Sequence, residues 1–158
     1  MIPIAKPYLT ADEAQAAYDT ILTGWITQGP RVAEFEEKFA SYTGAKYAVA
    51  VSNCTTALHL AMIVAGVGAG DEVICPSMSY VATANCIKYV GANPVFAEIN
   101  PVNYNLDVID TEKKITSKTK AILLVHQIGM PADIDAFRKL ADKYGLKLIE
   151  DAACAAGS

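Results

Sequence analysis

The sequence lacks the features that identify several common classes of protein. Its 158 residues contain no G-x-G-x-x-G and no G-x-x-x-x-G-K-[ST] segment, so dinucleotide-binding and P-loop folds lose their main support. Apolar runs stop well short of the roughly 20 residues that a membrane-spanning helix needs, and no membrane partner is expected. Positive charge is not in excess, because the formal net charge is -4. Nucleic acid is therefore not an expected partner.

Cysteine is scarce, and its spacing matches no metal site. The four cysteines are Cys54, Cys75, Cys86 and Cys154, and none forms a C-x-x-C pair. We therefore expect reduced thiols and no bound metal. The first seven residues also lack the basic and apolar segments of a signal peptide. A cytoplasmic protein is the expectation.

Apolar residues, by contrast, are abundant, at 53% against 19% charged residues, which predicts a folded core. From Lys46 onward, short apolar runs alternate with segments of helical periodicity. We expect strands at 47–51, 72–75, 94–99, 121–125 and 146–149, and helices at about 55–65, 80–90, 108–115 and 133–144. This alternation is typical of a three-layer α/β fold with a mostly parallel sheet covered on both faces.

The first part of the chain has a different pattern. Residues 1–45 are expected to form an N-terminal helical segment, with amphipathic helices at 10–22 and 31–42 that pack on the sheet domain or on a partner subunit. Residues 46–158 are expected to form the α/β domain. Because the sequence ends soon after its last strand with no closing helix, we expect this domain to be truncated.

Polar residues gather where the predicted strands end, and ligands of open α/β sheets bind beyond the carboxyl ends of the strands. Thr55 and Thr56 lie at a helix N-terminus, where hydroxyl and backbone N–H groups can hold a phosphate. The alternative is that Ser52 or Thr55 is simply a helix cap. Tyr80 follows the second strand and either stacks on a flat ligand or packs on the surface.

Titratable residues follow two further strands. Glu150 and Asp151 come directly after the last strand, where a carboxylate can hold a cation or a protonated ring nitrogen, or can cap a helix. His126 ends the most apolar strand, and a lone histidine there is more often a hydrogen-bonded structural residue than a catalyst. His59 lies within a predicted helix and is expected to be structural.

Seven short motifs occur in order along the chain. They are GWITQG at 24–29, FE at 35–36, SNCTTALHL at 52–60, GDEVI at 70–74, PSMSY at 76–80, VHQIG at 125–129 and EDAA at 150–153. Together they resemble the DegT/DnrJ/EryC1/StrS aminotransferases. These are fold-type I enzymes that use pyridoxal 5'-phosphate (PLP) and mostly aminate nucleotide-linked keto sugars. The resemblance implies that the chain is the N-terminal part of such an enzyme's large domain.

The resemblance also implies a role for each matching residue. Thr55 and Thr56 would hold the PLP phosphate, and Tyr80 would stack on the pyridine ring. Asp151 would pair with the ring nitrogen and keep it protonated, so that the ring can accept electrons. Cys154 stands where many relatives carry Gln or His that reaches the PLP 3-hydroxyl. Because a thiol is a weak donor, this contact would be lost or replaced by a water.

The family's Schiff-base lysine has no counterpart in this sequence, since its segment would follow Ser158 together with the small C-terminal domain. Lys46, Lys88, Lys120 and Lys147 all lie outside that motif. The 158-residue chain alone is therefore expected to be inactive.

The complete enzyme would use PLP or its aminated form PMP to transfer an amino group, from glutamate, to a keto group of a nucleotide-linked sugar in polysaccharide biosynthesis. It would be a homodimer. One alternative is a PLP/PMP-dependent sugar dehydratase of the same family, in which histidine replaces the lysine. The others are a nucleotide-binding Rossmann-like module and a non-catalytic interaction module.

Overall fold

The computed structural model describes residues 6–158. Residues 1–5, part of the segment whose composition argues against a signal peptide, lie outside the described residues. The chain divides into two compact units, Met1–Ala50 (unit 1) and Val51–Ser158 (unit 2). A domain boundary after residue 45 stays a prediction.

Unit 1 contains two helices joined by a loop, α1 (Ala11–Leu22) and α2 (Pro30–Thr43), which confirms both helices expected there. A capping box starts α1, because the Glu13 carboxylate accepts the Thr10 N–H at 2.6 Å while the Thr10 hydroxyl accepts an N–H of the first turn. Pro30 starts α2 and Gly44 ends it at a φ of 70°, a left-handed conformation that favours glycine.

The segment after α2 is not the strand that the sequence predicts. Residues 47–51 form no hydrogen-bonded ladder with any strand in the described part of the chain, so the expected strand at this position is wrong. Glu36 fixes the segment in another way, because its Oε1 accepts the Ala50 N–H at 2.8 Å. The apolar, β-prone composition predicts extended backbone, but a strand also needs a neighbour with which to pair.

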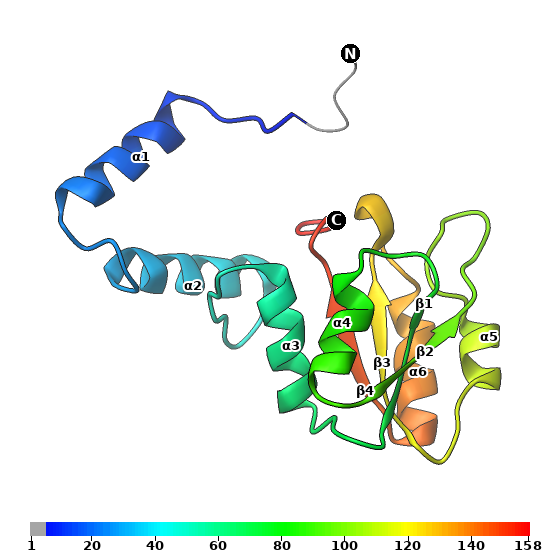
Figure 1. The fold of residues 1–158 in the computed structure, drawn as a ribbon. Coiled ribbons are helices and arrows are strands. Elements are labelled where there is room, and N and C mark those ends of the chain that lie inside the picture. Colours follow the sequence, from blue (N-terminus) through cyan, green and yellow to red (C-terminus); the bar gives the residue numbers. More distant parts are fainter. Residues whose placement is uncertain (1–5) are drawn as a thin grey trace. The chain divides into compact units, whose positions relative to one another are not determined.

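Unit 2 is built on a four-stranded parallel sheet in the order β2-β1-β3-β4 (Figure 1). The strands are β1 (Glu72–Pro76), β2 (Asn93–Ala97), β3 (Thr119–Val125) and β4 (Lys147–Asp151). Because all neighbours pair in parallel, the carboxyl ends of the four strands share one edge of the sheet. In the register, Pro76 is paired with Ala97, and Val125 with Asp151.

Helices cover both faces of this sheet. They are α3 (Cys54–Val64), α4 (Ala82–Tyr89), α5 (Val108–Lys113) and α6 (Ile134–Tyr144), with a 3₁₀ turn, η1 (Gln127–Gly129), after β3. Alternate residues of a strand enter different cores: Val73 and Cys75 pack with residues of α3 and α4, whereas Ile74 packs with Phe137 of α6. The predicted three-layer α/β fold is confirmed.

Candidate functional site

A cavity of about 140 Å³ lies at the carboxyl edge of the sheet in unit 2. Its lining comes from the last residues of β3 and β4 and from the segments that follow β1, β3 and β4. It consists of Ser79, Tyr80, Val125, His126, Gln127, Ile128, Asp151, Ala153 and Cys154. The structure thus brings together three of the residues that the sequence analysis selected, Tyr80, Asp151 and Cys154. Residues 125–128 of the VHQIG motif, to which the resemblance assigned no role, form part of the same wall.

Asp151 is the carboxylate of this cavity. It is the last residue of β4, its side chain is buried, and its Oδ1 accepts the Ala153 N–H at 3.1 Å. Glu150 is exposed and does not line the cavity. Successive side chains of a strand point to opposite faces, which is why only one of the two adjacent carboxylates enters the site.

The sequence predicts a phosphate site at the N-terminus of α3. Asn53 caps this helix, because its side-chain oxygen accepts the Thr56 N–H at 2.9 Å. The idea that Ser52 or Thr55 is the cap is therefore wrong. The Thr56 hydroxyl lies 3.1 Å from the same Asn53 oxygen and 3.2 Å from the Ser52 hydroxyl. Cys54 and Thr55 are the first two residues of α3, where backbone N–H groups have no intrahelical partner.

Cys54 connects this helix terminus to the cavity. Its thiol donates to Asp151 Oδ1 across 3.5 Å. Burial raises the pKa of the Cys54 thiol, and the negative charge of Asp151 raises it further, so the sulfur keeps the proton that it donates. Cys54 was not predicted from the sequence as a site residue, since only its position before the paired threonines pointed to the site.

His126 lines the cavity, but both nitrogens of its ring have protein partners. Nδ1 accepts the Ala132 N–H at 3.0 Å, so a neutral ring carries its proton on Nε2, which lies 3.4 Å from Glu150 Oε2. This arrangement fits the expected structural role. His59 lies on α3 with its ring edge-on to Tyr89, at 5.4 Å between ring centroids, as expected for a packing residue.

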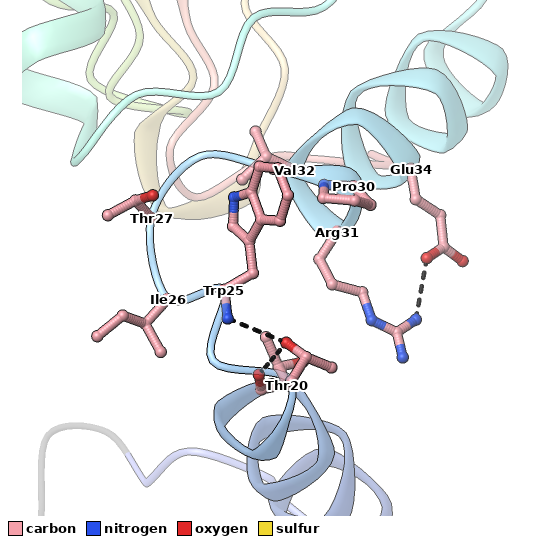
Figure 2. A pocket seen from close by; sticks show the side chains of 10 residues that line it. Thr20, Trp25, Ile26, Thr27, Pro30, Arg31, Val32 and Glu34 are labelled. Atoms are coloured by element: carbon pink, nitrogen blue, oxygen red, sulfur yellow. Dashed lines mark hydrogen bonds and ion pairs between the residues drawn. The ribbon is translucent and has the colours of Figure 1, made fainter.

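A larger cavity, of about 390 Å³, lies in unit 1 beside the loop between α1 and α2. Figure 2 shows the Trp25 indole next to the first turn of α2, near Pro30 and Val32. The indole N–H donates to Gln28 O at 2.7 Å, and the charged residues Arg31 and Glu34 pair with each other at 3.1 Å. The one carboxylate in this lining, that of Glu34, is thus already paired with a cation. The cavity beside Asp151 is therefore the stronger candidate for an active site.

Residues 6–158 lack two further kinds of feature. No described helix has the length and apolar character to cross a bilayer. Within the same residues, no three His, Cys, Asp or Glu side chains lie together as a metal site would require.

Comparison with known proteins defines the class. Residues 7–158 match the family model described as the DegT/DnrJ/EryC1/StrS aminotransferase family. Over 156 residues the chain is 43% identical to the UDP-4-amino-4-deoxy-L-arabinose–oxoglutarate aminotransferase of Shewanella sediminis, with 99% of this chain and 40% of that protein aligned. Over 152 residues it is also 43% identical to the spore coat polysaccharide biosynthesis protein SpsC of Bacillus subtilis, at 96% and 39% coverage.

The likeness extends to solved structures. The crystal structure of NtdA from Bacillus subtilis with bound cofactor PMP gives a TM-score of 0.90 at 36% identity, over 94% of this chain and 35% of that chain. The chain therefore belongs to the DegT/DnrJ/EryC1/StrS aminotransferase family. It spans about two fifths of the length of the curated relatives it matches.

Proposed function

We propose that this chain supplies the cofactor-binding wall of a PLP/PMP-dependent sugar aminotransferase. The single observation that carries the proposal is the buried Asp151 carboxylate, which lines one cavity with Tyr80 and is joined through Cys54 to the N-terminus of α3. That set of groups matches the charged parts of the cofactor, a protonated ring nitrogen and a phosphate. The family match and the PMP bound to NtdA agree with this choice.

The residues present fit the cofactor. Asp151 would hold the ring nitrogen, since a buried carboxylate needs a cationic or hydrogen-bonded partner. The backbone N–H groups at the start of α3, with the hydroxyls of Thr55 and Thr56, would hold the phosphate. Tyr80 is 76% exposed, so its ring is available for stacking. Cys154, exposed at the rim, offers only a weak donor to the 3-hydroxyl.

When bound, the cofactor supplies the electron sink for amino transfer. Asp151 supplies a fixed negative charge that keeps a proton on the ring nitrogen. The Ala153 N–H and the Cys54 thiol both bind Asp151 Oδ1, which holds the carboxylate in one orientation. Because this carboxylate is buried, water screens its charge little, and the pairing is stronger than at the surface.

No lysine lines the cavity among the residues that the structure describes. A lysine that bonds to the cofactor and moves the proton between two carbons therefore has no counterpart in this wall. We infer that the chain binds the cofactor without a covalent bond and does not catalyse turnover by itself. In the proposed complete enzyme, residues 1–45 form a helical segment and residues 46–158 part of the cofactor-binding domain.

The substrates are proposed from the relatives. The Shewanella protein is named for a UDP-linked amino sugar and for oxoglutarate, the keto form of glutamate. We propose a nucleotide-linked keto sugar as acceptor, glutamate as donor, and a homodimer as the complete form. Four free cysteines are consistent with a reducing, cytoplasmic setting.

The test is a titration of the purified protein with PMP, in which binding is monitored by the fluorescence of the cofactor ring. PMP has no aldehyde and cannot react with lysines, so saturable binding reports the pocket alone. NAD serves as the control ligand for a Rossmann-like module. We expect saturation at one PMP per chain and no NAD binding. Binding of NAD, or no saturable PMP binding, would overturn the proposal.

A second measurement addresses the lysine. The protein is incubated with PLP and reduced with borohydride, and the adducts are mapped by mass spectrometry. Scattered, substoichiometric labelling without amino transfer is expected. One stoichiometric lysine adduct accompanied by amino transfer to a keto sugar would contradict the inferred lack of turnover.

A further inference from the structure

The segment after β3, which forms part of the cavity wall, contains a residue with a strained backbone. Ile128 has a φ of 52° and a ψ of 33°, the left-handed conformation, although a β-branched side chain disfavours it. The side chain is nonetheless 84% exposed, so burial of apolar surface does not hold it there. Since strain of this kind persists only where the surroundings impose it, other contacts must fix this loop.

Those contacts converge on Asn105, which is 1% exposed and lies 22 residues before Gln127 in the sequence. Its Oδ1 accepts the Gln127 N–H at 2.9 Å. Its Nδ2 donates to Met130 O and to Pro131 O, both at 3.0 Å. One side chain thus binds the backbone on both sides of Ile128 and uses both of its N–H donors.

Asn105 is itself fixed by its own loop. Its N–H donates to Asn103 Oδ1 at 3.1 Å, and its carbonyl accepts the Asn100 N–H at 2.8 Å. The preceding residue, Tyr104, has a φ of 59°, a second non-glycine residue in the left-handed region. These two hydrogen bonds hold the Asn105 backbone in place. Its side-chain amide can therefore fix the backbone conformation of residues 127–131.

The strained loop also contacts the segments after β1 and β4, both of which line the cavity. The Gln127 side chain donates to Met78 O, two residues before Tyr80. Gly129 lies so close to the segment after β4 that a Cβ there would be 3.1 Å from Cys154 O. Ile128, between these two anchored residues, lines the cavity together with Tyr80 and Asp151.

We propose that Asn105 is a positioning residue of the cofactor site, and that the strain it maintains seats the Ile128 side chain against the bound PMP or PLP ring. The proposal rests on the proposed function, because it assigns the occupant of the cavity. Beyond that function, it assigns a role to Asn105, which does not line the cavity, and an apolar contact with the cofactor ring to Ile128. The Asn105 amide acts only through the backbone of residues 127–131.

Two variants separate positioning from folding. Asn105→Asp keeps an oxygen for the Gln127 N–H but removes both donors to Met130 and Pro131. Ile128→Gly removes the rim side chain and relieves the strain, because glycine adopts a positive φ freely. Asn93→Ala is the matched control, since Asn93 is an exposed asparagine at the other end of the sheet.

The readouts are the affinity for PMP, backbone hydrogen exchange over residues 127–131, and Tm. For Asn105→Asp we expect exchange in this loop at least about tenfold faster and a PMP Kd about tenfold higher. For Ile128→Gly we expect a Tm no lower than that of the wild type together with a weaker affinity for PMP. A stable protein that binds its ligand less well is not the signature of a merely structural residue. Asn93→Ala should match the wild type in every readout.

Unchanged PMP affinity in Ile128→Gly would overturn the proposal, as would a loop in Asn105→Asp that exchanges at the wild-type rate. If Asn105→Asp fails to fold, Asn105→Ser, which adds no buried charge, takes its place in the same readouts, while Ile128→Gly tests the rim contact separately. A wild-type protein that binds no PMP would refute the proposed function, and this inference with it. That failure is distinguishable because it appears without any substitution.

Discussion

Replacing Asp151 by asparagine removes one negative charge from the cavity and changes little else. Asn has the same shape, and its side-chain oxygen can still accept the Ala153 N–H that Asp151 Oδ1 accepts at 3.1 Å. The second oxygen becomes an amide NH₂, which can donate to an unprotonated ring nitrogen but cannot hold a protonated one. The substitution therefore tests the charge of Asp151 and not its packing.

The magnitude follows from the bond that is lost. A hydrogen bond to a charged partner contributes about 1.5–3 kcal/mol, and the burial of Asp151 places the value above that of an exposed pair. At about 1.4 kcal/mol per factor of ten, PMP should bind roughly tenfold to a hundredfold more weakly. In a longer form of the enzyme that carries the lysine, transamination should fall by at least about a hundredfold, near 3 kcal/mol.

The assay is the PMP titration, with Glu150→Gln as the matched control. Glu150 is the neighbouring carboxylate, and its neutralisation raises the net charge by the same single unit outside the cavity. Tm is measured for both variants, so that a loss of fold is not taken for a loss of affinity. Wild-type affinity in Asp151→Asn, or equal losses in the two variants, would refute the role of Asp151.

Three further predictions follow from other parts of the chain. Thr55→Ala combined with Thr56→Ala should weaken PMP binding by about one to a few kcal/mol, a partial loss because the backbone donors remain, and should not unfold the protein. Unchanged affinity in the fluorescence titration would favour a structural role for both hydroxyls. Gly29→Ala should displace the only tryptophan, because a Cβ there would overlap the Trp25 indole, and its emission should shift to longer wavelength; an unchanged spectrum would contradict the close contact. Burial raises the pKa of Cys75 to about 12 and that of Cys86 to about 11 from 9.0, which favours their neutral thiols in the folded state. The resulting stability is present below pH 9 and lost as the pH rises toward 12, so urea unfolding should show a falling free energy over that window, and a flat profile would contradict the burial.

Much of the fold could be predicted from local pattern. Continuous apolar runs and helical periodicity gave the four strands and four helices of unit 2 and the two helices of unit 1, because those signals lie within each segment. The order β2-β1-β3-β4 lies outside such signals, since pairing joins residues far apart in sequence. The failed strand at 47–51 shows the same limit, because propensity alone supplies no partner.

The residues of the candidate site also fall into two groups, those that local sequence could predict and those that needed the structure. Asp151 and Tyr80 could be selected because side chains at the ends of parallel strands meet at one edge. The residues alone left Glu150 and Asp151 equivalent, and the resemblance assigned the role to Asp151; in the structure only Asp151 lines the cavity, because of the phase of β4. The cap at Asn53 needed the backbone geometry of α3. Asn105 left no signal in the sequence, because it reads as an ordinary loop asparagine until its contacts with residues 127–131 are seen.

The most direct test of the central claim is to locate bound PMP on the chain by NMR. Amide shifts of ¹⁵N-labelled protein are followed during titration with PMP and, separately, with pyridoxamine, which lacks the phosphate. We expect PMP to shift the amide signals of Cys54, Thr55 and Ala153. Pyridoxamine should shift that of Ala153 and leave those of Cys54 and Thr55 unchanged. Saturable shifts confined to the Trp25 loop of unit 1, or none at either group of amides, would contradict the claim that this wall binds the cofactor.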